Sequence, residues 1–157
     1  MLEKIKKYSK SIYIPFIVLG IVIAILHFQI TKIYDDLIFS AVLDDGTKIF
    51  EYLSSRYNGW TSRLVIEFFL VVLSNENTSL VIWKIIDVLM FELLAYSTYK
   101  IFIKDVKDNN KKLCLTWILI LAILAFPYTL LCEAGYIATT TNYLWVLTFR
   151  NVHIYIN

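Results

Sequence analysis

The chain of 157 residues is strongly apolar: 59% of its residues are hydrophobic, only 18% are charged, and its mean hydropathy is +0.65. Soluble domains of this size usually have about 45–50% apolar and about 25% charged residues. With a net charge of only +2, this composition excludes a disordered chain, a basic nucleic-acid-binding domain and a disulfide-stapled secreted module. We therefore expect an all-α integral membrane helical bundle with no nucleic acid among its partners.

Three apolar stretches are long enough to cross a bilayer, whose hydrocarbon core of about 30 Å is spanned by about 20 helical residues. They cover residues 12–30, 78–101 and 113–132. The first follows a lysine-rich leader but lacks a small-residue cleavage site, so it is expected to be a retained anchor and not a signal peptide. The sequence thus predicts three transmembrane helices, with the lipid bilayer as a partner.

Basic residues are concentrated on one side of these spans. Four lysines precede Ser11 and five lie within residues 100–112, whereas the longer segment 31–79 has four basic residues against seven acids. Because cytoplasmic loops carry the excess of Lys and Arg, the N-terminus is predicted to be cytoplasmic and the segment 31–77 external. This external segment is expected to contain amphipathic helices that lie along the outer face of the membrane.

A fourth span begins at Tyr143 but is not completed. Seven residues of apolar character, 143–149, are followed by Arg150, Asn151 and His153. Because a span needs about 20 apolar residues, the single membrane domain 1–157 is expected to be a truncated part of a longer bundle.

Two adjacent acids, Asp35 and Asp36, come within about one helical turn of the end of the first span and begin a segment with helical apolar spacing. Adjacent carboxylates at a membrane surface suit a general base or a site for a divalent cation, the one cofactor that this sequence suggests. The alternative is that both acids complement the dipole at a helix N-terminus.

The same external segment ends in Tyr57, Trp60 and Arg63. A guanidinium at the mouth of an apolar helix suits bidentate binding of phosphate, either of a substrate or of a lipid headgroup. The two aromatic side chains suit a substrate-binding surface, or else belong to the aromatic belt of the membrane interface.

A second external segment contains Glu133, Asn142, Tyr143 and Trp145. The acid and the amide suit hydrogen bonds to a hydroxyl-rich ligand, and the aromatic rings offer stacking faces. The alternative is an ordinary loop with belt aromatics.

The second predicted span carries Lys84, Asp87 and Glu92. Lys84 and Asp87 are spaced to neutralise each other on one helix face, whereas Glu92 has no partner in its own helix.

These features, in this order, resemble the start of bacterial multi-pass membrane glycosyltransferases of the GT-C type. They resemble more closely a group of uncharacterised relatives of glucosyltransferases that modify surface polysaccharides. The matching residues are Asp35, Asp36, Tyr57, Trp60, Ser62 and Arg63, and the element 142–145 further along.

The resemblance implies that the parent protein lies in the bacterial plasma membrane and transfers a sugar from a polyprenyl-phosphate carrier to an extracytoplasmic glycan acceptor. It implies that Asp35 or Asp36 is the base or a metal ligand, that Arg63 binds the carrier phosphate, and that Trp60 and Trp145 line the sugar site. Because such enzymes have many more spans, this chain alone is expected to be inactive.

A non-catalytic function is the alternative. A small multi-pass membrane protein of this length could be an accessory subunit, or a transporter fragment in which Asp87 and Glu92 line the pathway.

Overall fold

The structure, a computed structural model, describes residues 11–44, 46–59, 63–75, 77–130 and 134–157, without the side chains of 77 and 126–130. These residues form helices joined by loops, and none of them is in a β-strand. The helices are α2 (Ile14–Phe28), α3 (Asp35–Ala41), α4 (Ile49–Gly59), α5 (Leu64–Asn75), α6 (Asn77–Phe102), α7 (Asn109–Leu130), α8 (Tyr136–Thr139), the π-helical turn η1 (Thr140–Leu144) and α9 (Trp145–Ile156).

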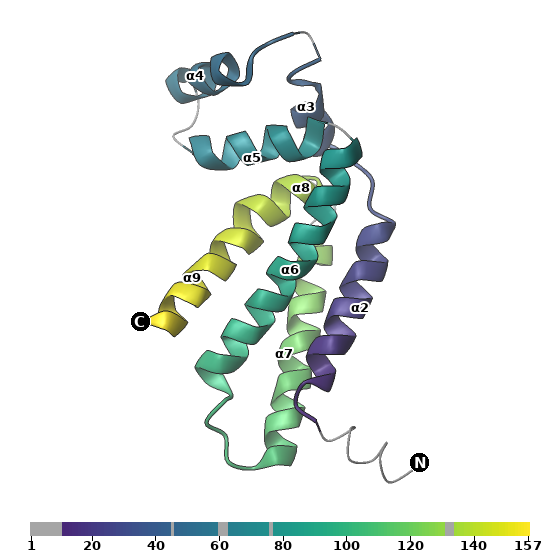
Figure 1. Ribbon diagram of the computed structural model, residues 1–157, viewed down its shortest axis with the longest axis vertical. Coiled ribbons are helices and arrows are strands. Elements are labelled where there is room, and N and C mark those ends of the chain that lie inside the picture. The colour runs from purple at the N-terminus through teal and green to yellow at the C-terminus, as the bar shows by residue number, and fades with distance from the viewer. Residues whose placement is uncertain (1–10, 45, 60–62, 76, 131–133) are drawn as a thin grey trace.

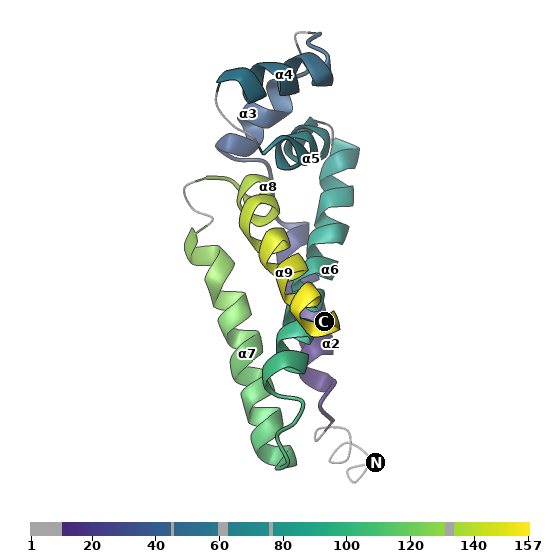
Figure 2. The same cartoon turned by 90° about the vertical axis from the view of Figure 1, so that its left-hand side faces the viewer.

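The long helices α2, α6, α7 and α9 extend along the long axis of the molecule, and α2 lies beside α6 (Figure 1). The short helices α3 and α4 gather with α5 at one end, above the start of α8 (Figures 1 and 2). From there α8, η1 and α9 follow one another without a break and run back along α6. At this end of the molecule, α3, α4 and α5 therefore lie close to α8, which comes much later in the chain.

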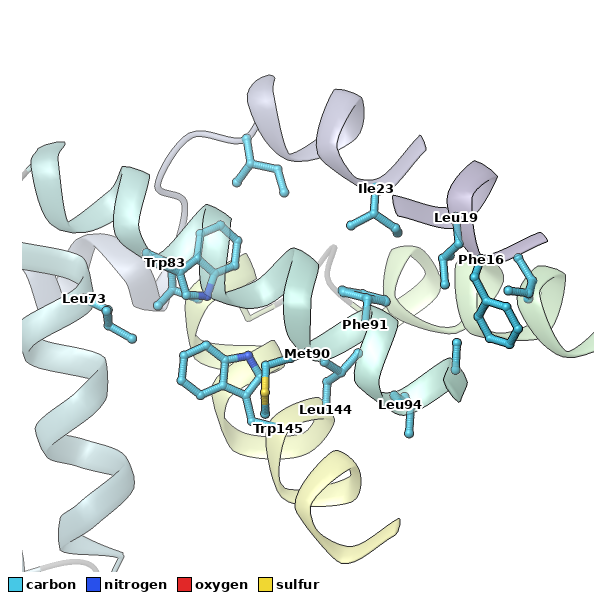
Figure 3. Packing of buried hydrophobic residues seen from close by; sticks show 14 of the residues in the cluster. Phe16, Leu19, Ile23, Leu73, Trp83, Met90, Phe91, Leu94, Leu144 and Trp145 are labelled. Atoms are coloured by element: carbon cyan, nitrogen blue, oxygen red, sulfur yellow. The ribbon is translucent and has the colours of Figure 1, made fainter. Parts of the chain in front are cut away.

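The core lies between α2, α6 and α9, as Figure 3 shows. Helix α2 begins with Pro15 in its first turn, where a proline costs no hydrogen bond. Its buried residues Phe16, Leu19 and Ile23 recur every three or four positions and form one face toward α6. Trp83 is the largest of the fully buried side chains in the described part of the chain.

The prediction of membrane spans is wrong. Among the described residues, no helix combines the length and the apolar character that crossing a bilayer needs. Helix α2 has 15 residues, about 22 Å at the helical rise, against a hydrocarbon core of about 30 Å. Helix α6 has 26 residues but its charged residues interrupt every long apolar window, and α7 begins with four polar residues and has described side chains only as far as Ala125.

The expected integral membrane bundle with spans at 12–30, 78–101 and 113–132 is therefore corrected to an all-α bundle without such spans in the described residues. The expected multi-pass location in a plasma membrane, with a cytoplasmic N-terminus, is corrected for the same reason. The segment interpreted as an incomplete fourth span continues as α9, which passes through Arg150 and His153 and ends at Ile156.

A buried polar junction ties α2, α6 and α9 together at Asp87. One of its oxygens, Oδ2, lies 2.7 Å from Nε2 of His27, and the other accepts a hydrogen bond of 2.6 Å from Nε1–H of Trp145. Nδ1 of His27 lies 2.9 Å from the carbonyl oxygen of Ile23, which can only accept, so Nδ1 bears a proton. Asp87 thus bonds to two other helices, while Lys84, its expected partner, donates to the carbonyl oxygen of Phe28 at 3.3 Å.

Candidate functional site

A cavity of about 460 Å³ opens among α3, α4, α5 and η1, at the end of the molecule where these segments meet. Its polar lining residues come from positions far apart in the sequence. They are Asp35, Tyr52, Arg56, Arg63, Glu67, Thr139, Asn142 and Tyr143. Asp35, Arg63, Asn142 and Tyr143, all singled out from the sequence, therefore lie around one space.

Arg63 and Asn142 connect the two sides of this cavity. Nη1 of Arg63 donates a hydrogen bond of 3.4 Å to Oδ1 of Asn142, a residue 79 positions later in the chain. The amide nitrogen of Asn142 donates in turn to the carbonyl oxygen of Ala138 at 2.8 Å, which fixes the orientation of the side chain. Arg63 is exposed and lines the cavity.

A second polar group lines the cavity around Glu67, whose side chain is buried. Its two oxygens accept hydrogen bonds from the hydroxyl of Tyr52 at 3.0 Å and from Nη2 of Arg56 at 3.2 Å. Burial and the adjacent Glu67 charge raise the pKa of Tyr52 to about 12, so its hydroxyl stays protonated and donates. The hydrogen bond to Glu67 also raises the pKa of Arg56. This arrangement holds the acid and pins α4 onto α5.

Asp36 does not line the cavity, although it is adjacent to Asp35. It is completely buried, and its oxygens accept hydrogen bonds from the backbone N–H groups of Tyr136 at 2.8 Å and Ala138 at 2.9 Å. Burial raises the pKa of Asp36 and outweighs these hydrogen bonds, which lower it. The carboxyl thus fastens α3 to the first turn of α8.

Gly135 permits this close approach. Its φ of +94° favours glycine, and a Cβ built there would lie 2.7 Å from Oδ1 of Asp36 and 2.8 Å from the carbonyl oxygen of Ile33. No other residue type fits this position without moving the Asp36 carboxyl.

The remaining predicted site residues are placed elsewhere. Trp145 is buried in the core, where it bonds to Asp87, and it does not line the cavity. Tyr57 is exposed on α4 and is also not among the lining residues. Trp60 and Glu133 lie outside the described residues.

The cation site at Asp35 and Asp36 stays a prediction. In the described part of the chain, no three His, Cys, Asp or Glu side chains are grouped closely enough to hold a metal ion. Both oxygens of Asp36 are already engaged with backbone N–H groups.

Sequence reasoning missed Tyr52, Arg56 and Glu67 as cavity residues. A signal was present, because Glu67 interrupts an otherwise apolar helix and two arginines, Arg63 and Arg56, precede it. A buried acid requires such a partner. The packing of α4 on α5, which brings Arg56 and Glu67 together, was not predictable from spacing alone.

Comparison with protein-family models, with characterised proteins and with solved structures gives no match for this chain.

Proposed function

We propose that the cavity binds a phosphorylated sugar and that the chain is the donor-binding part of a glycosyltransferase. One observation carries this proposal: Asp35 and Arg63, selected from the two ends of one segment, and Asn142, selected from another, line the same cavity. The family resemblance supplies the finer assignment, in which the phosphate belongs to a polyprenyl-phosphate carrier and the acceptor is a glycan.

Arg63 is the phosphate ligand in this proposal. Its guanidinium offers several N–H donors in a fixed plane, and one of them already points to Asn142. The other cavity arginine, Arg56, is committed to Glu67 and contributes to the shape of the site. Asn142 and Tyr143 lie on the same turn of η1, so an amide and an aromatic face are both available to the sugar.

Asp35 is the general base in this proposal. It removes the proton of an acceptor hydroxyl, whose oxygen attacks the anomeric carbon of the sugar. The bond from that carbon to the phosphate oxygen breaks, the phosphate leaves with the electron pair, and Arg63 offsets its charge. Asp35 suits this role better than Asp36, because Asp36 is buried away from the cavity.

Calorimetric titration of the full chain with glucose 1-phosphate, with neutral glucose as the reference, tests the proposal. We expect the phosphorylated sugar to bind and Arg63→Gln to weaken it about 10- to 100-fold, since a hydrogen bond to a charged group contributes about 1.5–3 kcal/mol. Arg150→Gln is the matched control, because Arg150 is an exposed arginine on α9 and does not line the cavity.

Two results would contradict the proposal. One is equal binding of glucose and glucose 1-phosphate by the unmodified chain. The other is equal loss of affinity in the Arg63 and Arg150 variants, which would mean that the ligand senses only the overall charge.

A further inference from the structure

Helices α2 and α6 leave an open apolar groove along the outside of their packed core. It has a volume of about 560 Å³. Its apolar lining residues are Ala24 and Phe28 of α2 and Val81, Ile85, Val88 and Leu89 of α6. Phe28 is 86% exposed and Leu89 is 62% exposed. Contiguous apolar surface of this kind marks a place where another molecule binds.

The groove continues past Leu89. That residue also lines a neighbouring hollow of about 360 Å³, which Tyr13, Phe16, Glu92, Leu93 and Tyr96 complete. From Val81 to Tyr96 the two hollows follow α6 for about 22 Å at the helical rise. Together the two hollows are therefore long enough for a single extended hydrocarbon chain.

Each of the two hollows has one lining side chain that belongs to Lys or Glu. Lys84 lines the first hollow, and its ammonium donates to the carbonyl oxygen of Phe28 at 3.3 Å. An ammonium has three donors, and no carboxylate in the described part of the chain lies within ion-pair distance of Lys84. Glu92 lines the second hollow. His27 also borders the groove, but both of its ring nitrogens are engaged, with Ile23 and Asp87.

We propose that this groove binds a long-chain fatty acid, with its carboxylate on Lys84 and its hydrocarbon tail along Ile85 and Leu89 toward Tyr96. A single lysine matches a single negative charge, whereas a phosphate headgroup usually requires more donors. Lys84 lines only the first of the two hollows, so it sets the direction in which the ligand lies. The site is separate from the sugar-phosphate cavity and does not depend on the function proposed for it.

A second copy of this chain is a less suitable occupant. Two identical concave surfaces placed face to face would leave a hollow between them, and close packing across an interface requires complementary shapes. A flexible hydrocarbon chain fills a groove without that restriction.

Calorimetric titration of the full chain with hexadecanoate, below the concentration at which it forms micelles, tests the inference. We expect binding that weakens about three- to four-fold for each methylene removed in the series from hexadecanoate to decanoate. Hexadecanol has the same tail without the charge, so it should bind at least about ten-fold more weakly than hexadecanoate.

Two pairs of variants distinguish binding of the ligand's carboxylate from binding of its hydrocarbon tail. Lys84→Gln should remove the preference for hexadecanoate over hexadecanol, whereas Lys111→Gln, at an exposed position in the first turn of α7, should keep it. Leu89→Gln should weaken both ligands about ten-fold, since Leu89 lines both hollows. Leu121→Gln is its control, because Leu121 on α7 is 61% exposed and lines neither hollow.

Three outcomes would overturn the inference. The first is equal affinity for the acid and the alcohol. The second is an effect of Lys84→Gln no larger than that of Lys111→Gln. The third is concentration-dependent dimerisation that Leu89→Gln abolishes, which would show that a second copy occupies the groove. Because the groove and the cavity are separate sites, none of these outcomes tests the proposal that the cavity binds glucose 1-phosphate.

Discussion

Asp35 and Asp36 are adjacent in the chain but have different surroundings, which separates their roles. Asp35 lines the cavity, while Asp36 is completely buried and bonds to the backbone of the segment after Gly135. The sequence allowed two interpretations of this acidic pair: both acids are site residues, or both complement the start of a helix. The structure treats the two acids differently, so one interpretation need not hold for both.

Replacing each acid by its amide tests this separation. Asp36→Asn places an NH₂ group against a backbone N–H, so we expect a loss of about 1–3 kcal/mol in the free energy of unfolding. Asp35→Asn is the matched control and should change stability by less than about 0.5 kcal/mol. Urea denaturation measures both, and a larger loss for Asp35→Asn would contradict the assignment.

Glu92 makes stability depend on pH. Burial raises its pKa in the folded chain, so the folded state holds this proton more tightly than the unfolded state does. The resulting stabilisation is complete below the unfolded pKa and is lost as the pH rises through the folded pKa. Glu92→Gln stays neutral throughout this range.

We therefore expect the stability of the wild type, relative to Glu92→Gln, to fall as the pH is raised from about 4 to about 7. Unfolding measured by circular dichroism at several pH values would show this difference. Glu51→Gln removes an exposed acid of α4 and serves as the control, which should follow the wild type. Parallel stability curves for the wild type and Glu92→Gln would refute the prediction.

At the scale of whole elements, α2, α6 and α9 depend on the junction at Asp87. Its two oxygens bond to side chains of two different helices, and its own side chain is completely buried. Trp83 stacks on His27 with 5.4 Å between ring centroids, which shields the junction further.

Removing this carboxylate should strongly destabilise the bundle. Asp87→Ala leaves His27 and Trp145 without their partner in a buried place, and breaking a buried pair costs about 3–5 kcal/mol. Asp105→Ala removes an exposed acid near the end of α6 and should cost less than about 0.5 kcal/mol. Similar thermal unfolding midpoints for the two variants would mean that the junction at Asp87 contributes little to the stability of the bundle.

Several local features were predictable from the sequence. An acidic first turn marks the start of α3 at Asp35. Arg63 and Asn142 were selected for their chemistry, and both line the cavity.

The arrangement of the helices was not predictable in the same way. Mean apolar character does not distinguish a helix covered by lipid from one that packs on other helices, and this ambiguity produced the erroneous spans. The partner of Asp87 is His27, 60 positions earlier, and i, i+3 spacing pointed to Lys84 instead. Nothing local in the sequence indicates such long-range pairs.

For the whole molecule, the unequal burial of its helices implies unequal stability. Leu53 is the buried residue of α4, which is otherwise attached to α5 through the Glu67 hydrogen bonds. Helix α6 contains Trp83, Phe91 and Leu94 of the core. Segments with few buried contacts open locally at low cost.

Amide hydrogen exchange should show this difference. We expect the amides of α4 to exchange by local opening, at least about 100-fold faster than those in the middle of α6. Bound glucose 1-phosphate should slow exchange in α4 and leave the end of α7 near Lys111 unchanged, because α4 borders the cavity. Uniform protection of both helices would contradict the expected order of stability.

The hydrogen bonds from the backbone of Tyr136 and Ala138 to Asp36 join residues 100 and 102 positions apart. During synthesis, the ribosome adds Asp36 at least 100 residues before the N–H groups that its carboxyl requires. Because synthesis adds about 5–20 residues per second, the Asp36 carboxyl has no native hydrogen-bond partners for several seconds. Ligand binding on a translating ribosome should therefore begin only after the η1 residues have emerged, which would make the cavity a late marker of correct folding.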